Sequence, residues 1–267
     1  MERAPLDPAR LQDALAARWA RVDVVDQTAS TNADLLADSG APDRTVLVAE
    51  HQVAGRGRFE RRWESPARAG LTFSVLLRPT VPLVNWGWLP LLAGLGLHEA
   101  VTEHTGVPTS VKWHNDLLAH PHGGKLAGIL AQSAGEVVVV GIGLNVTTTA
   151  EELPVETATS LALAGVTDVD RTELLVAILR RIDARVAQWT DCRGDAAACG
   201  LTAAYRSACS TIGRPVRVVL TEDRDSQDGG DIRGEAVDVD EMGRLVLRTD
   251  GGERVIGAGD VEHLRPA

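Results

Sequence analysis

Lysine and asparagine are both rare in this chain of 267 residues. Only two of its 27 basic residues are lysines, Lys112 and Lys125, and they lie 13 residues apart. The chain uses arginine almost everywhere else. Its lysine at these two places therefore indicates that a compact and strongly hydrated point charge is needed there. The asparagines are Asn32, Asn85, Asn115 and Asn145. The alternative is that these lysines and asparagines are retained by chance. The motifs around them make that alternative weaker.

Cysteine and long apolar runs are also scarce. The three cysteines, Cys192, Cys199 and Cys209, are odd in number and have no CxxC spacing, which favours reduced thiols over disulfides or a metal site. No stretch approaches the roughly 18 consecutive apolar residues that span a bilayer. The first residues lack the apolar core of a signal peptide. We therefore expect a cytoplasmic protein that does not bind membranes.

The composition, 44% hydrophobic and 24% charged, is typical of a globular protein, and the length allows one large domain and one small one. The formal net charge is −10. Because affinity for nucleic acid comes from neutralising phosphates, this balance argues against a nucleic-acid partner.

The segment 50–70 stands out against that negative charge. It reads EHQVAGRGRFERRWESPARAG and holds five arginines, two of which alternate with Gly55 and Gly57. Apolar, β-branched runs at 45–49 and 71–77 predict strands on both sides of it. Glycine lets the backbone come close to a ligand, and arginine matches phosphate or carboxylate oxygens with two parallel hydrogen bonds. The pattern favours a ligand-binding loop, and a solvated hairpin is the alternative.

Apolar periodicity predicts helices from Pro8, at 86–104, at 171–190 and near 196–210. At 27–36, Ser30 or Thr31 can cap a further helix, and plain capping competes with ligand binding there. Strands are expected at 22–25, 111–113, 117–119, 123–132 and 137–146. Glycine in the last of these is typical of bulges, whereas Gly128 indicates close approach by a ligand or a neighbouring backbone.

After residue 212 short strands alternate with turns, at 216–220, 232–239, 244–247 and 254–256, with an acidic loop at 221–230. This texture predicts a small SH3-like barrel. We therefore expect two domains, residues 1–210 and 211–267. His114 lies in a turn with no nucleophile beside it, so a structural role is favoured, and the other histidines show no metal-ligand spacing.

Five segments occur in the order and spacing of biotin protein ligases. They are STN at 30–32, GRGRFERRW at 55–63, KWHND at 112–116, GGKLAGILAQ at 123–132 and GIGLN at 141–145. The resemblance covers nearly the whole chain and is closest in texture to actinobacterial members. It implies an α+β fold, namely the mixed β-sheet flanked by helices of class II synthetase-like biotin and lipoate ligases, with a C-terminal SH3-like barrel. The family usually has proline at the position of His114.

The resemblance also implies the reaction. Such enzymes join biotin to ATP to give biotinyl-5′-AMP and then transfer biotin to a lysine of the biotin carboxyl carrier domain of an acyl-CoA carboxylase, with Mg²⁺ as cofactor. The catalytic residues expected by resemblance are Arg58, Lys112, Asp116 and Lys125. Those expected to bind biotin are Ser30, Thr31, Asn32, Gln52, Gly55, Arg56, Gly57, Arg58, Lys125 and Gly128. Those expected to bind the nucleotide are Arg58, Arg61, Trp63, Lys112 and Asn145. No protein metal ligand is predicted.

Two other functions remain open at this stage. A lipoate–protein ligase would share the fold and the adenylate chemistry, but the GRGRxxRxW pattern and the C-terminal strands favour biotin. A biotin-sensing regulator would carry a DNA-binding winged helix, and the catalytic part is expected to begin almost at the start of this chain. A monomer or a weak homodimer is expected, without any dimer-specific signal.

Overall fold

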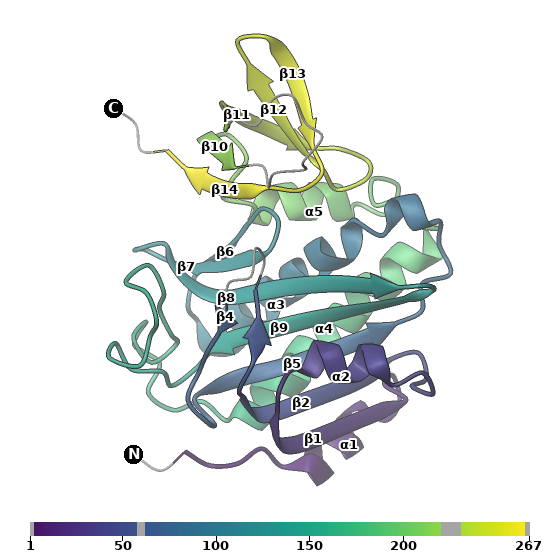
Figure 1. Ribbon diagram of the computed structural model, residues 1–267, viewed down its shortest axis with the longest axis vertical. Helices are drawn as coiled ribbons and strands as arrows, with labels where there is room; N and C mark the ends of the chain where they lie inside the picture. The colour runs from purple at the N-terminus through teal and green to yellow at the C-terminus, as the bar shows by residue number, and fades with distance from the viewer. Residues whose placement is uncertain (1–2, 58–61, 220–230, 265–267) are drawn as a thin grey trace.

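The computed structural model describes residues 3–57, 62–219 and 231–264 of the chain. These residues form a larger body built on one sheet and a smaller body made of C-terminal strands (Figure 1). The expected acidic loop at 221–230, together with Arg58 and Arg61, lies outside the described residues.

The larger body is organised around a seven-stranded mixed sheet with the order β1-β2-β5-β9-β8-β7-β6. β1 and β2 are parallel, and the other neighbouring pairs are antiparallel. The strands are β1 (Arg21–Thr28), β2 (Thr45–Gln52), β5 (Gly70–Leu77), β6 (Thr109–Lys112), β7 (Asp116–Ala119), β8 (Gly124–Ala134) and β9 (Val137–Asn145). The sequence therefore located the strands of this sheet to within a few residues.

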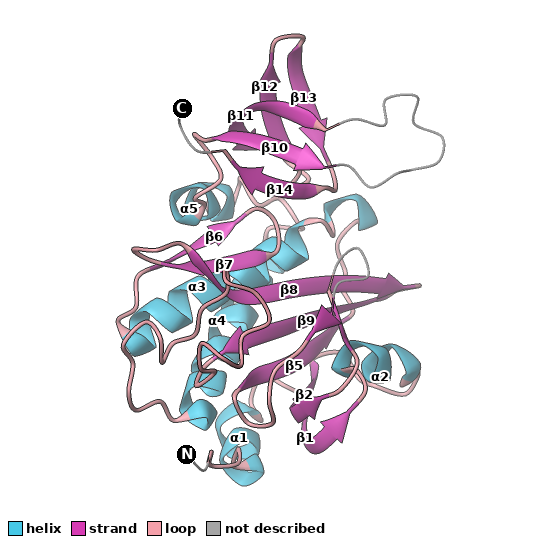
Figure 2. Ribbon diagram, turned by 60° about the vertical axis from the view of Figure 1, so that its left-hand side comes forward, coloured by secondary structure: helices cyan, strands magenta, loops and turns pink. Residues whose placement is uncertain are grey.

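Helices cover both faces of this sheet (Figure 2). On one face lie α1 (Pro8–Leu15), α3 (Trp88–Thr105) and α4 (Arg171–Asp191), and on the other lies α2 (Thr31–Ala37). The alternation along β5 follows from this arrangement. Leu71, Phe73, Val75 and Leu77 enter the large core under α3 and α4, while Leu76 packs in a small cluster under α2. The α2 side of the sheet therefore has room for polar residues.

Capping residues fix where the helices begin. Asp7 caps α1 by accepting a hydrogen bond from the backbone N–H of Arg10, with Pro8 in the first turn. Ser30 caps α2 by accepting from Ala33, so the capping expected of Ser30 or Thr31 is made by Ser30. α3 ends at Gly106, whose φ of 72° is left-handed. Within the residues that the structure describes, no helix is both long enough and apolar enough to cross a membrane.

A buried ion pair fixes the two ends of the arginine-rich segment. Arg171 lies 2.8 Å from Glu50 at the end of β2, and both side chains are almost fully buried. The same guanidinium donates to the carbonyl of Gly70 at the start of β5. Between these points Gly55–Arg56 (β3) pairs with Arg62–Trp63 (β4), with Gly55 opposite Trp63. The segment thus starts and returns at one buried anchor.

The smaller body is a five-stranded antiparallel sheet with the order β13-β12-β11-β10-β14. Its strands are β10 (Pro215–Val219), β11 (Ile232–Val239), β12 (Leu245–Thr249), β13 (Gly252–Ile256) and β14 (Asp260–His263). Four were expected from the sequence, and β14 was missed. The SH3-like closure of these strands into a barrel stays a prediction.

Tryptophan side chains join the two bodies. The indole N–H of Trp113 donates to the carbonyl of Gly243 at 3.0 Å, and that of Trp88 donates to Glu241 at 2.7 Å. The helix α5 (Leu201–Ala208) leads the chain from the larger body to the smaller, and Arg206 on it contacts Asp238 at 2.5 Å. These contacts place the β11–β12 turn next to the start of α3 and the β6–β7 turn.

Candidate active site

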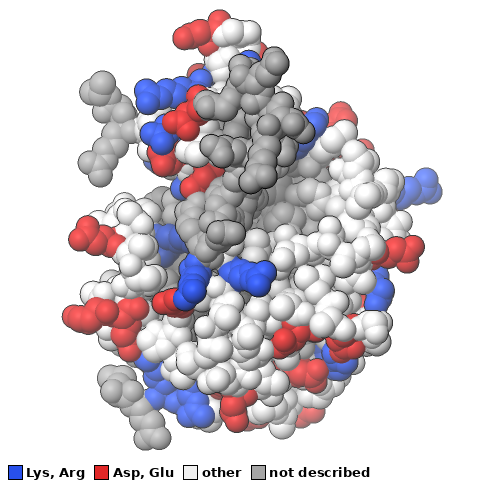
Figure 3. Space-filling model, in the orientation of Figure 1, with Lys and Arg blue, Asp and Glu red and all other residues white. Residues whose placement is uncertain are grey.

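A large cavity of about 990 Å³ opens on the α2 side of the sheet. Its walls come from the start of α2, the arginine-rich segment, β7–β9, the segment 154–158 and the C-terminal strand β14. Figure 3 shows basic side chains close together near the middle of that face, with acidic and other basic side chains over the rest of it. Because strands distant in sequence meet here, the cavity brings together most of the motifs singled out above.

One end of the cavity is lined by uncharged polar groups. Gln52, at the end of β2, accepts a hydrogen bond from the backbone N–H of Thr31 at 3.0 Å through its Oε1 atom. The hydroxyl of Thr31 lies 2.7 Å from that of Ser74, which in turn donates to Asn32 at 2.6 Å. Ser30, Thr31 and Asn32 are all buried. This end can recognise a small polar ring through hydrogen bonds.

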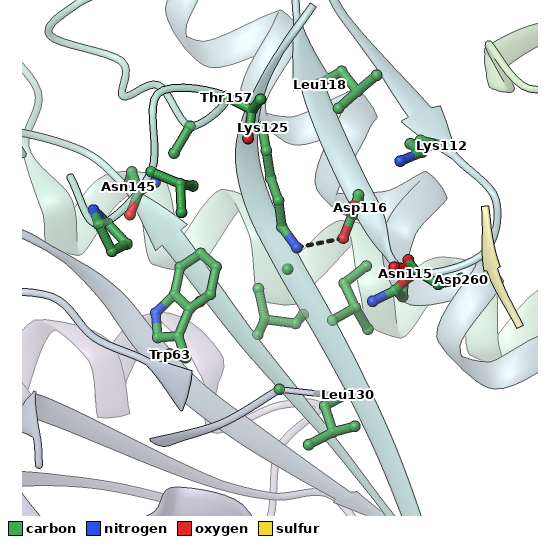
Figure 4. Close-up of a pocket in the computed structure, with 18 of the residues that line it drawn as sticks. Trp63, Lys112, Asn115, Asp116, Leu118, Lys125, Leu130, Asn145, Thr157 and Asp260 are labelled. Atoms are coloured by element: carbon green, nitrogen blue, oxygen red, sulfur yellow. Dashed lines mark ion pairs between the residues drawn. The ribbon is translucent and has the colours of Figure 1, made fainter. Parts of the chain in front are cut away.

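The centre of the cavity holds an ion pair. The ammonium of Lys125 lies 2.7 Å from a carboxylate oxygen of Asp116, and Figure 4 shows the two side chains meeting across β7 and β8. A register irregularity aims Lys125 into the cavity. Leu117 pairs with Ala127 and Leu118 with Lys125, so the intervening residue of β8 is extra.

Backbone hydrogen bonds hold Lys125 from the other side. Its N–H donates to the carbonyl of Thr157 at 2.8 Å, and its own carbonyl accepts from Thr159 at 2.9 Å. These bonds fix the backbone of Lys125, while Asp116 holds its side chain. Asn145, at the end of β9, uses its amide to bond the carbonyl of Thr159 at 2.9 Å and so fixes the same segment.

Trp63 lies over a floor made by two glycines. Gly128 and Gly143 are register partners on β8 and β9. A Cβ at Gly143 would lie 2.2 Å from the indole ring, and one at Gly128 would lie 3.1 Å from it. The ammonium of Lys125 is 6.0 Å from the centre of the Trp63 ring. The side chain therefore rests within the cavity, in reach of any ligand bound beside Lys125 (Figure 4).

The C-terminal sheet supplies the remaining wall. Arg214 and the residues of β14 line the cavity near Lys112. His263 and the hydroxyl of Thr211 share a hydrogen bond of 3.0 Å. The same hydroxyl accepts a hydrogen bond from the backbone N–H of Trp113. Burial, with the nearby positive charges of Lys112 and Arg214, lowers the pKa of His263 to about 4. His263 is therefore neutral near pH 7, so the positive charge of this wall comes from Lys112 and Arg214.

The structure brings most of the expected site residues to this cavity. Those that line it are Ser30, Thr31, Asn32, Gln52, Arg56, Gly57, Trp63, Lys112, Asp116, Lys125, Gly128 and Asn145. Gly55 lies beside Gln52, where its missing side chain leaves room for the Gln52 amide nitrogen. Arg58 and Arg61 are outside the described residues.

Sequence reasoning missed several contributors. Ser74 has no local signal, since it is a serine inside an apolar strand. Arg214 and β14 also line the cavity, and only the packing of the two bodies brings them there. Gly141 and Gly143 were interpreted as bulge positions, but β9 pairs with both neighbours without a register shift. The sequence signal for these two glycines was the GIG pattern, which could have been interpreted as space for side chains from other elements.

Comparison with known proteins matches both bodies. Residues 22–148 match the biotin/lipoate A/B protein ligase family, and residues 211–264 match the biotin protein ligase C-terminal domain. The chain is 47% identical to the biotin–[acetyl-CoA-carboxylase] ligase of Mycobacterium tuberculosis, over 98% of this chain and 97% of that protein. It is 34% identical to the bifunctional ligase/repressor of Bacillus subtilis, over 90% of this chain and 72% of that protein.

The fold is similar to a solved biotin protein ligase. The structure from Aquifex aeolicus in complex with biotin and ATP aligns with a TM-score of 0.77 at 31% identity, covering 93% of this chain and 100% of that one. The mixed sheet, the C-terminal strands and the sequence similarity over nearly the full length all indicate the same family. The chain belongs to the biotin protein ligase family.

Proposed function

We propose that this chain activates biotin with ATP to form biotinyl-5′-AMP and pyrophosphate, and then transfers biotin to a lysine of a biotin carboxyl carrier domain of an acyl-CoA carboxylase. The observation that carries this proposal is a single cavity with an uncharged polar end, a central Lys125–Asp116 pair and an aromatic ring beside the lysine. The order of these groups fits a ligand that is polar at one end and reacts at the other, next to a nucleotide.

In the first step a biotin carboxylate oxygen attacks the α-phosphorus of ATP, and pyrophosphate leaves. Two anions must meet, which Coulomb repulsion opposes. The described cavity supplies positive charge from Arg56, Lys112, Lys125 and Arg214. Lys125 holds the oxygens at the reacting centre, and Lys112 and Arg214 face the leaving phosphates. Fixed charges of this kind lower the barrier because they need no rearrangement during reaction.

The nucleotide occupies the cavity beside Trp63, whose ring offers a stacking surface for adenine. Arg58, Arg61 and Asn145 complete its binding. Among the described residues no three His, Cys, Asp or Glu side chains gather to hold a metal ion. A Mg²⁺ bound with the nucleotide would add charge neutralisation to that of the side chains named above.

In the second step the ε-amine of the acceptor lysine attacks the carbonyl carbon of the mixed anhydride, an amide bond forms and AMP leaves. Asp116 meets the incoming amine and takes up its proton. Its carboxylate is mostly buried and is held by Lys125, so its orientation is set before the acceptor arrives. Residues 1–210 form the catalytic domain in this proposal, and residues 211–267 close one wall. The chain acts in the cytoplasm as a monomer or a weak homodimer.

Label transfer tests the proposal. Purified protein is incubated with Mg-ATP, labelled biotin or lipoate, and a carrier domain with or without its target lysine. We expect biotin to label the intact carrier and not the lysine-free one. Transfer of lipoate instead would keep the adenylate chemistry and change the substrate, and failure to activate either acid would overturn the proposed function.

A further inference from the structure

We infer that Ser74 is a positioning residue that makes the hydroxyl of Thr31 a hydrogen-bond acceptor toward the cavity, so that the site selects a ligand ring carrying an N–H group. The inference rests on the proposed function. It names the group by which the polar end of the cavity discriminates biotin from lipoate. Ser74 does not touch the ligand in this account, and it acts through Thr31 and Asn32.

Ser74 is a buried hydroxyl at an unusual place. It lies in the middle of β5 with no exposed surface, and the residues on either side of it in the strand, Phe73 and Val75, are apolar. Its register partner on β9 is Gly141. A buried hydroxyl without partners is costly, so its bonds to Thr31 and Asn32 are needed for the strand to tolerate it. These bonds also order the residues in front of it.

The amide of Asn32 can adopt only one orientation. Its nitrogen donates to the carbonyl of Leu130 at 3.1 Å and to the side-chain oxygen of Gln132 at 2.8 Å. A backbone carbonyl only accepts, so turning the amide over would set two acceptors against each other. The Asn32 oxygen therefore faces Ser74, and the single proton of Ser74 is used in that bond of 2.6 Å.

This assignment decides the proton of Thr31. Since Ser74 has already given its proton to Asn32, the contact of 2.7 Å between the two hydroxyls requires Thr31 to donate. The other side-chain partner of Thr31 is the oxygen of Gln52 at 3.3 Å, which is also an acceptor. With its proton in the shorter bond, to Ser74, the hydroxyl of Thr31 turns only lone pairs toward the cavity.

The polar groups next to Thr31 offer hydrogen-bond donors to the cavity. The oxygen of Gln52 is occupied by the backbone N–H of Thr31, so its amide nitrogen is the end available as a donor. The hydroxyl of Ser30 accepts from Ala33 and keeps its own proton to give. The polar end thus offers donors and one acceptor side by side. A cyclic urea, whose carbonyl oxygen is flanked by N–H groups, matches this pattern, whereas a dithiolane ring has no N–H to give.

Gly141 keeps the relay in place. A Cβ at this position would lie 2.2 Å from the Asn32 side-chain oxygen, closer than any real contact. The glycine therefore leaves the space in which the Asn32 amide turns toward Ser74. Gly141→Ala and Ser74→Ala should disturb the same proton arrangement from opposite sides.

The test compares biotin with two analogues in which one or other ring N–H is replaced by oxygen, giving a cyclic carbamate. In the wild-type protein the isomer that sets its ring oxygen against Thr31 should have a kcat/KM for adenylation about 100-fold or more below that of biotin, because two acceptors face each other. In Ser74→Ala the Thr31 hydroxyl keeps only its longer contact of 3.3 Å with Gln52, so it can turn and donate to a ring oxygen instead. We expect the preference for biotin to fall by about tenfold or more, with KM for biotin raised and kcat within about twofold.

A matched control removes another fully buried serine hydroxyl. Ser160 is equally buried and bonds the backbone of Thr148 at 2.7 Å, away from Ser74. Ser160→Ala should keep the wild-type preference. Each ratio is measured on one preparation, so partial unfolding of a variant does not change it. Gly141→Ala serves as the second variant and should lower the preference as Ser74→Ala does.

The outcomes separate the two proposals. A wild-type preference that is absent, or that is unchanged in both Ser74→Ala and Gly141→Ala, would overturn this inference while leaving biotin ligation intact. A wild-type protein that adenylates no biotin would overturn the proposed function first. Loss of preference in these variants but not in Ser160→Ala would establish Ser74 as the residue that sets the polarity of Thr31.

Discussion

The ammonium of Lys125 occupies a narrow place between a carboxylate and an indole ring. It is 2.7 Å from Asp116 and 6.0 Å from the centre of the Trp63 ring. An arginine there would keep the charge but would spread it over a planar fork, which is wider and bonds two oxygens of Asp116 at once. The site therefore depends on the size of the cation as well as on its sign.

Lys125→Arg should accordingly lower the kcat of biotin adenylation by about 100-fold or more, in the range found when a group that stabilises the transition state is lost. Pyrophosphate release in a single turnover measures this step without the carrier domain. Arg181→Lys, at an exposed ion pair with Glu103, is the matched exchange of one cation for another and should change nothing. Near-normal adenylation by Lys125→Arg would contradict the size argument.

Scarcity located several cavity-lining residues from the sequence alone. Both lysines and three of the four asparagines, Asn32, Asn115 and Asn145, line the cavity. Asn85 does not, and it packs beside Gly194 instead. Ser74 could not be found this way, because serine is common and its role depends on which residues the folded sheet places next to it.

At the scale of elements, β9 shows how a strand can be shaped by the side chains that lie on it. Gly141 leaves room for Asn32, and Gly143 leaves room for Trp63. The two glycines are two residues apart, so both face the α2 side of the sheet. β9 is therefore a continuous strand whose α2-side face is bare only at Gly141 and Gly143, while Val139 on the same face packs under α2.

Gly143→Ala should displace Trp63 from this face. A Cβ would lie within 2.3 Å of two atoms of the indole, so the ring must move. If Trp63 stacks on the nucleotide, KM for ATP should rise by about tenfold, matching the 1–3 kcal/mol typical of a lost aromatic stack on a base, while KM for biotin changes little. Gly40→Ala, where the nearest atom is 3.6 Å away, is the control. A rise in KM for biotin alone would show that the floor serves the other substrate.

The elements that the sequence predicted well are those with strong apolar patterns. The helix expected at 171–190 is observed as Arg171–Asp191, because its apolar residues recur at helical spacing and Asp170 caps it. β14 was missed because Asp-Val-Glu-His has no such pattern and becomes a strand only by pairing with β10. β3 and β4 are two residues each and depend on each other in the same way.

For the whole molecule, one chain of contacts joins the C-terminal sheet to the KWHND turn. His263 bonds the hydroxyl of Thr211, and that hydroxyl accepts from the backbone N–H of Trp113. Burial comes first among the causes that hold the pKa of His263 near 4, followed by Lys112 and Arg214. In the unfolded chain the pKa of histidine is about 6.5. The unfolded state therefore binds one proton more than the folded state between these two values.

Stability from this group should be complete above about pH 6.5 and should be lost as the pH falls toward 4. We expect His263→Gln, which keeps a hydrogen-bonding partner for Thr211 and cannot take up the proton, to lose less stability than wild type between pH 7 and pH 4.5. Denaturant midpoints measured across this range compare the two proteins. Parallel pH profiles would show that His263 is equally easy to protonate in the folded and unfolded chains.

The placing of the tryptophans has an optical consequence. Trp19, Trp88, Trp113 and Trp189 are almost fully buried in the core, and Trp86 is tied to the backbone of Val81. Trp63 is the one tryptophan that lines the cavity among the residues the structure describes. Ultraviolet excitation therefore reads five indoles that do not line the cavity and one that a ligand can reach. A change in emission on adding nucleotide can be assigned to a single ring, so the protein carries its own fluorescent probe of site occupancy.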